Sequence, residues 1–130
     1  KLHTLRSRND QIAFDEKVYC AYEALYIIYL LEELLSSLDN LALKYKGVKM
    51  AGYTHTRRAQ IVSFKDYLEA FKEMFRRDQA RAGNFKESLS SFVGSGALAG
   101  TSIPYTSYKK AIDKFIKEFK GLPLKIKTVE

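Results

Sequence analysis

Apolar and polar residues follow a helical pattern over much of the chain, beginning with a long stretch from residue 10 to residue 45. This stretch contains neither glycine nor proline. Its apolar residues recur three and four positions apart, which is the spacing of a helix face. They form two neighbouring stripes, one of Ile12, Tyr19, Tyr22, Tyr26 and Tyr29 and one of Phe14, Val18, Leu25, Ile28, Leu31, Leu35 and Leu38. The pattern predicts a single helix whose two apolar stripes must both pack against neighbouring elements.

The length of this helix limits how the chain can fold. A helix over residues 10–45 extends for about 54 Å, whereas a compact globule of this size has a radius of gyration of about 14 Å. We therefore expect either an elongated bundle completed by other chains or a part of a larger helical protein. The alternative is a break at residues 36–40, where serine, aspartate and asparagine are good capping residues.

A polar stretch and a second helix are expected next. Gly47 is suited to end the long helix, because glycine favours the position after a last turn. Residues 52–60 are mostly polar and are expected to form a loop. Apolar residues at helical spacing then predict a helix over residues 63–82, ended by Gly83 and Asn84.

The remaining segments complete a mostly helical chain. Residues 85–92 are expected to form a short helix or turn, and residues 94–101 are a run of small residues. An amphipathic, lysine-rich helix is predicted over residues 105–120, and residues 121–130 are expected to be a strand or a frayed tail. The fold class is therefore all-α, a long-helix bundle fragment in which residues 1–130 form a single helical unit that completes its core by oligomerisation.

Composition agrees with one folded domain. The chain has 130 residues, of which 46% are hydrophobic and 28% charged, and this excludes a disordered chain. The net charge of +7 suits anionic partners, namely nucleic acid, an acidic membrane or a polycarboxylate substrate. The uncharged stretch from Ala24 to Leu31 is far shorter than the roughly 20 residues that span a bilayer, so we expect no membrane partner.

Cysteine and histidine are too scarce for a metal site of the usual kinds. Cys20 is the one cysteine, which fits a reducing, cytoplasmic setting. The two histidines, His3 and His55, match no metal-ligand spacing. The run at 94–101 lacks the lysine of a phosphate-binding loop and the spacing of a dinucleotide motif. We therefore expect neither a metal nor a cofactor, and we interpret that run as a tight connection.

Two segments carry candidate chemistry. Residues 6–11 bring arginines, a hydroxyl, an amide and the free N–H groups of a helix start together, which is equipment for binding carboxylates. The alternative is that Asn9 or Asp10 simply caps the helix. In residues 54–60, His55 is a candidate for proton transfer, because histidine is the side chain that changes its charge near neutral pH. The alternative for His55 is a surface histidine among arginines.

Three runs taken together are more specific than any one of them. KLHTLRSRNDQ at residues 1–11, GYTHTRRAQ at 52–60 and GSGALAGT at 94–101 resemble, in order and spacing, argininosuccinate lyase and its eye-lens relative delta-crystallin. The resemblance covers residues 1–104. It implies the reversible elimination of argininosuccinate to arginine and fumarate, by a cytoplasmic homotetramer. Long central helices form a bundle in that family, and each active site draws on different subunits.

The resemblance also implies a role for individual residues. His55 matches the histidine that acts as acid or base. The positions that match substrate-binding residues are Ser7, Arg8, Asn9, Thr54 and Gln60. Removing a proton beside a carboxylate builds negative charge there, so cationic and amide donors held in place stabilise the transition state.

The chain also departs from the family pattern. The Gly-Ser-Ser-x-Met-Pro loop, whose serine abstracts the proton, is absent from these residues, so we do not expect turnover by the chain alone. Further differences from the common family residues occur at Leu5, Ala51, Arg57 and Ile61, and at Phe92 and Val93.

Two other functions remain open from the sequence. One is a non-catalytic structural or interaction protein of the delta-crystallin type. The other is a basic helical nucleic-acid binder that uses Arg76, Arg77, Arg81 and the lysines of residues 109–120. No aromatic platform or groove-reading motif accompanies these charges, so we expect no nucleic-acid partner.

Overall fold

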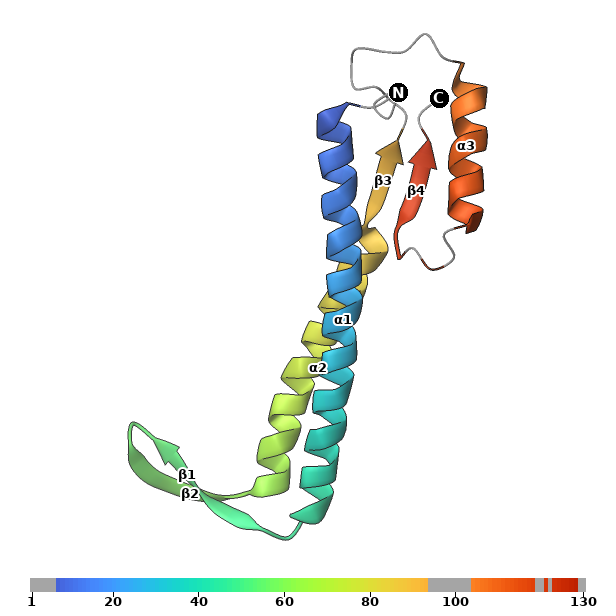
Figure 1. Cartoon of the computed structure of the whole chain (residues 1–130). Helices are drawn as coiled ribbons and strands as arrows, with labels where there is room; N and C mark the ends of the chain where they lie inside the picture. Colours follow the sequence, from blue (N-terminus) through green and yellow to red (C-terminus); the bar gives the residue numbers. More distant parts are fainter. Residues whose placement is uncertain (1–6, 94–103, 119–120, 122, 129–130) are drawn as a thin grey trace. The chain divides into compact units, whose positions relative to one another are not determined.

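The computed structural model describes residues 7–93, 104–118, 121 and 123–128. In chain order the elements are α1 (Arg8–Lys44), β1 (Lys49–Thr54), β2 (Arg57–Ser63), α2 (Phe64–Ser88), β3 (Ser90–Val93), α3 (Tyr105–Glu118) and β4 (Lys125–Thr128) (Figure 1). The chain divides into two compact units, one of Lys1–Leu25 with Asn84–Glu130 and one of Tyr26–Gly83. The helices confirm the predicted all-α class, to which two small sheets are added.

Helix α1 is continuous through residues 36–40, so the alternative of a break there is wrong. Ser37 explains why a possible capping residue does not end the helix. Its hydroxyl donates a hydrogen bond of 2.8 Å to the carbonyl oxygen of Glu33, one turn earlier. The polar side chain is therefore satisfied inside the helix and leaves the backbone hydrogen bonds in place.

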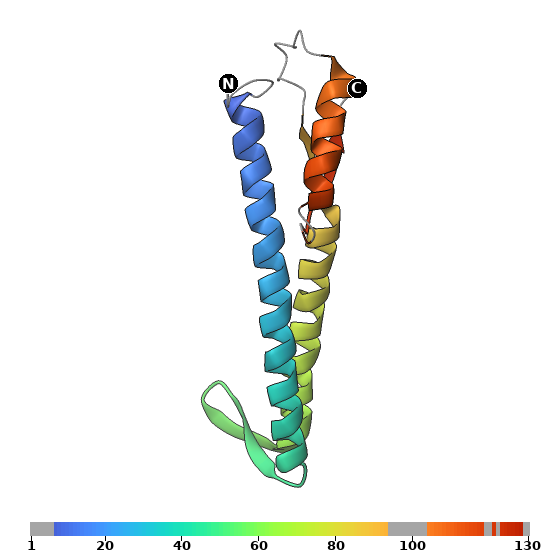
Figure 2. The same ribbon diagram turned by 45° about the vertical axis from the view of Figure 1, so that its right-hand side comes forward.

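In the unit of residues 26–83, α1 and α2 lie side by side (Figures 1 and 2). Ala42 and Leu68 are buried in this unit. At the hairpin end, the rings of Tyr45 and Phe64 meet edge to face with centroids 6.0 Å apart, a favourable arrangement for an aromatic pair. Half-buried residues of α1 extend this apolar surface at helical spacing, namely Ile28, Leu31, Leu35 and Leu38.

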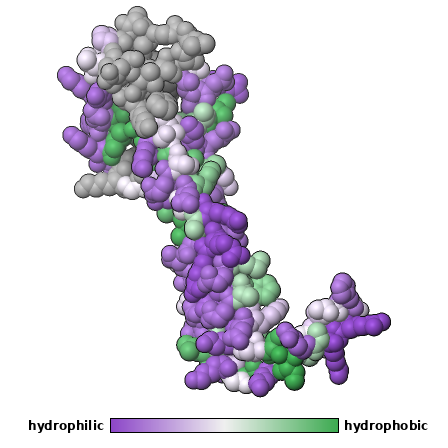
Figure 3. All heavy atoms as spheres, turned by 180° about the vertical axis from the view of Figure 1, so that it is seen from behind, coloured by the Kyte–Doolittle hydropathy of each residue, from purple (hydrophilic) through white to green (hydrophobic). Residues whose placement is uncertain are grey.

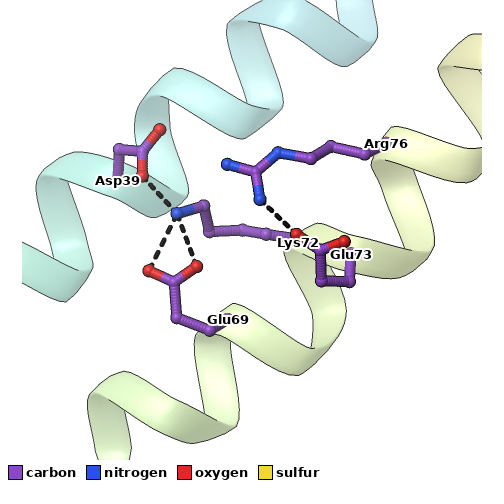
Figure 4. Close-up of polar contacts among 5 residues, drawn as sticks. All are labelled: Asp39, Glu69, Lys72, Glu73 and Arg76. Atoms are coloured by element: carbon purple, nitrogen blue, oxygen red, sulfur yellow. Dashed lines mark hydrogen bonds and ion pairs between the residues drawn. The ribbon is translucent and has the colours of Figure 1, made fainter.

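A buried lysine joins the two helices by charge (Figure 4). Lys72 of α2 is only 2% exposed, and its ammonium group binds Asp39 of α1 and both carboxylate oxygens of Glu69, the latter two at 2.9 Å each. The two carboxylates raise the pKa of Lys72 through these hydrogen bonds. A buried charge is tolerated where it is paired and hydrogen-bonded, so this cluster fixes which turns of α1 and α2 face each other.

Residues 52–60 are not the polar loop that the sequence predicts. β1 and β2 pair as an antiparallel hairpin, with Lys49 opposite Ser63 and Thr54 opposite Arg57. The backbone of this polar stretch satisfies its hydrogen bonds in the ladder, since strand formation does not require apolar side chains on both faces.

The end of α2 also differs from the prediction. The helix does not stop at Gly83 but continues to Ser88, where β3 follows after one residue. A side chain at Gly83 would meet nothing within 4 Å. Glycine inside a helix is unfavourable by about 1 kcal/mol but does not forbid it.

A parallel strand pair forms part of the other unit. β3 pairs with β4 in register from Ser90 opposite Lys125 to Val93 opposite Thr128, and the chain between them contains α3. This confirms the strand alternative for part of the tail at 121–130. Lys17 of α1 donates a hydrogen bond of 2.9 Å to the carbonyl oxygen of Ser90, which ties the start of β3 to α1. In the described part of the chain, no helix is long and apolar enough to cross a membrane.

Two glycine substitutions are expected to act in opposite directions. Gly83→Ala should raise the free energy of unfolding by about 1 kcal/mol, because it lies in a helix with open space around it. Gly52→Ala should lower the free energy of unfolding, since its Cβ would lie 3.0 Å from the carbonyl oxygen of Gln60. Urea unfolding followed by circular dichroism checks both, and a change of the same sign in both variants would contradict the expectation.

The Lys72 cluster predicts a loss of stability at high pH. The folded state raises the pKa of Lys72 above 10.5, so its stabilising contribution is complete below that pH and is lost as the pH rises through the folded-state value. Wild type should therefore lose more stability between neutral pH and about pH 11.5 than Lys72→Met does. Lys65→Met, which removes an exposed lysine of α2, is the matched control. An equal pH dependence in wild type and Lys72→Met would contradict the prediction.

Candidate functional site

The second candidate segment lies at the tip of the β1–β2 hairpin. Thr54 ends β1, Arg57 begins β2, and the connection between them is the two-residue turn of His55 and Thr56. Two-residue turns are the tightest common hairpin connections, and their length fixes the strand register. The side chain of His55 is exposed at this tip.

The turn holds both of its residues in the left-handed region. The φ angles are 49° for His55 and 65° for Thr56, and positive φ at both central residues is the pattern of a type I′ turn. Asparagine and glycine are the usual residues there, whereas a β-branched threonine is an outlier. The hydroxyl of Thr56 donates a hydrogen bond of 2.6 Å to the carbonyl oxygen of His55. Strain of this kind clusters at functional sites.

A bulge lies behind the turn and involves the other candidate residue of this segment. Ala51 pairs with Ile61 and Tyr53 pairs with Arg58, so Ala59 and Gln60 both stand opposite Gly52. The missing side chain of Gly52 leaves room for the carbonyl oxygen of Gln60. Bulges bend a strand and redirect its side chains, which places Gln60 at a bend and not in the regular ladder.

The first candidate segment is the start of α1. Ser7 directly precedes the helix, and its carbonyl oxygen accepts the first helical hydrogen bond, from the N–H of Gln11 at 3.1 Å. Ser7 therefore has the capping position, and the alternative that Asn9 or Asp10 is the cap is wrong. Arg8 and Asn9 are exposed in the first turn, where backbone N–H groups have no partner within the helix.

The structure assigns the two segments to different units. Ser7, Arg8 and Asn9 belong to the unit with Lys1–Leu25, whereas Thr54, His55 and Gln60 belong to the unit of Tyr26–Gly83. Within the second unit, the hairpin brings Thr54 and His55 together at one tip, with Gln60 in the bulge behind them. The third run, at residues 94–101, lies outside the described residues.

Two arginines of α2 on which the nucleic-acid alternative depends have carboxylate partners. Arg76 pairs with Glu73, and Arg81 pairs with Asp78 at 2.6 Å.

Among the described residues, no group of three or more histidine, cysteine, aspartate or glutamate side chains is placed to hold a metal ion.

Comparison with known proteins identifies the family. A family model described as lyase matches residues 1–129. Argininosuccinate lyases from Desulforamulus reducens and Pelotomaculum thermopropionicum are each 47% identical to the chain over 105 residues, which is 80% of this chain and 23% of each relative. The argininosuccinate lyase of Clostridium botulinum is 43% identical over 125 residues, which is 89% of this chain and 28% of the relative.

The chain thus spans about a quarter of the length of the curated relatives it matches. Both described candidate segments and the connecting helix lie inside the residues that the family model covers. The chain belongs to the lyase family, and within that family it is similar to argininosuccinate lyases.

Proposed function

We propose that the chain supplies substrate-binding and proton-transfer groups for the reversible elimination of argininosuccinate to arginine and fumarate. The observation that carries this proposal is the strained two-residue turn, which presents His55 at an exposed tip next to Thr54. Histidine is the side chain best suited to give or take a proton near neutral pH. The similarity to argininosuccinate lyases over most of the chain supports the choice of reaction.

The reaction requires negative charge to be stabilised and a leaving group to be protonated. We assign the binding of substrate carboxylates to Ser7, Arg8 and Asn9, because first-turn N–H groups, a guanidinium and an amide all donate to anions. Thr54 binds substrate through its hydroxyl, and Gln60 orients its neighbours from the bulge. His55 protonates the departing guanidinium nitrogen, directly or through one water.

Abstraction of the proton beside the carboxylate is assigned to residues outside these 130. The chain contains no Gly-Ser-Ser-x-Met-Pro run. We therefore propose that the chain binds substrate but does not complete the reaction by itself.

We also propose that copies of the chain associate as a cytoplasmic homotetramer. Apolar side chains of α1 support association, because large ones are exposed along it; Leu43 is 72% and Tyr19 is 65% exposed. Figure 3 shows hydrophobic residues at the surface among hydrophilic ones. Exposed apolar side chains that gather into a patch are typical of protein interfaces.

A chimeric enzyme tests the proposed reaction. In the argininosuccinate lyase of Desulforamulus reducens, the matched segment is replaced by this chain, and fumarate release is measured by its absorbance. We expect activity in the chimera and a fall in kcat of at least about 100-fold on His55→Asn, since general acid catalysis contributes that much or more.

Lys65→Gln, an exposed position on α2, is the control and should retain the activity of the chimera. Unchanged kcat in the His55→Asn chimera would refute the role of His55. A folded chimera that binds argininosuccinate but releases no fumarate would instead support the non-catalytic, delta-crystallin type of function.

A further inference from the structure

The hairpin is a cationic segment without acidic residues of its own. Residues 49–63 contain Lys49, Arg57 and Arg58 but no aspartate or glutamate. Hydrophilic side chains occupy the end of the hairpin in Figure 3, at the lower right. Opposite charges within a helical turn neutralise Arg76 and Arg81 of α2, but the hairpin offers its arginines no such partner.

Arg57 is the hairpin cation placed beside a candidate binding residue. Its side chain is exposed, and within the described part of the chain it forms no ion pair. A guanidinium presents a planar fork of donors that matches the two oxygens of a carboxylate. An exposed and unpaired fork of this kind is available to a carboxylate ligand.

The strand register determines on which face of the hairpin the side chain of Arg57 lies. Arg57 stands directly opposite Thr54, whereas Arg58 stands opposite Tyr53. Opposed residues of an antiparallel pair have their side chains on the same face, with Cβ atoms about 4.5–5.5 Å apart. Successive residues of a strand alternate between faces. Arg57 therefore shares a face with Thr54, and Arg58 lies on the other face.

The turn keeps this pair in place. Thr54 and Arg57 flank His55 and Thr56, whose positive φ angles and 2.6 Å hydrogen bond define a two-residue connection. A slip by one residue would need a different turn. The side chains of Thr54 and Arg57 thus start from neighbouring Cβ atoms on one face before any ligand arrives.

We propose that Arg57 binds a carboxylate of the substrate on the face of the hairpin that carries Thr54, and that it makes the site selective for dicarboxylates. This inference rests on the proposed function, since it takes Thr54 and His55 to be part of the substrate site. It adds a charged recognition residue to that function. The Thr54 hydroxyl and the Arg57 guanidinium donate hydrogen bonds to the same carboxylate, and the charged donor binds that carboxylate more strongly than a neutral donor would.

Fumarate binding to the complete 130-residue chain tests the proposal. The dicarboxylate is titrated into labelled protein, and nuclear magnetic resonance follows the backbone amide of Thr54 and the side chain of Arg57. We expect saturable binding that weakens at least about 10-fold in Arg57→Gln, because a hydrogen-bonded charge pair is lost. Arg57→Lys should bind with intermediate affinity, since it keeps the charge but not the fork.

Arg58→Gln is the matched control, because it removes the same charge from the opposite face, and it should bind within about twofold of wild type. Circular dichroism confirms that each variant is folded. Absence of fumarate binding to wild type, equal binding to Arg57→Gln, or an equal loss in Arg58→Gln would overturn the proposal. Inorganic phosphate is the second probe, and affinity equal to that of fumarate would overturn the selectivity for carboxylates.

Turnover of the chimera separates this proposal from the proposed function. An inactive chimera together with Arg57-dependent fumarate binding would refute the proposed reaction. The proposed carboxylate site would still be supported. An active chimera in which Arg57→Gln changes neither the fumarate affinity nor the KM for argininosuccinate would refute the proposed carboxylate site. The proposed reaction would still be supported.

Discussion

The small interior of the chain is the constraint on which the rest of the structure depends. The buried apolar side chains in its described part are Ala21, Ala24, Ala42, Leu68 and Leu124, and no large side chain there is completely buried. Burial of apolar surface stabilises a fold by about 25 cal/mol per Å², so these residues supply little. Ion pairs and backbone hydrogen bonds also connect the elements, as in the Lys72 cluster and the two sheets. Large apolar side chains of α1 remain exposed to solvent.

Helical periodicity is sufficient to predict most of the helical structure. The pattern predicts α1 over residues 10–45 and the helix spans Arg8–Lys44, and α3 begins at Tyr105 as predicted. Both depend on local spacing, which a sequence displays directly. The end of α2 is predicted less well, because Gly83 weakens a helix without stopping it and the surrounding space decides the outcome.

Pairing between distant residues cannot be predicted from the pattern. β3 and β4 are separated by α3, and Lys72 meets a carboxylate 33 positions away. The sequence does not predict the hairpin, because its turn residues are His55 and Thr56. The usual sequence signal for a tight hairpin turn is Asn-Gly. The motif therefore predicts Thr54 and His55 as candidate residues, whereas their geometry, and the pairing that places Arg57 beside Thr54, require the structure.

The proposed tetramer would complete the apolar interior of the chain with other copies of itself. Exposed apolar surface on α1 is the reason for it, and the same association would assemble candidate residues from several chains into complete sites. The most direct test is the molar mass of the folded chain, measured by sedimentation equilibrium. We expect a tetramer of about 60 kDa, four times the 14.9 kDa of one chain. A folded species of 14.9 kDa that unfolds cooperatively as a monomer would contradict the claim.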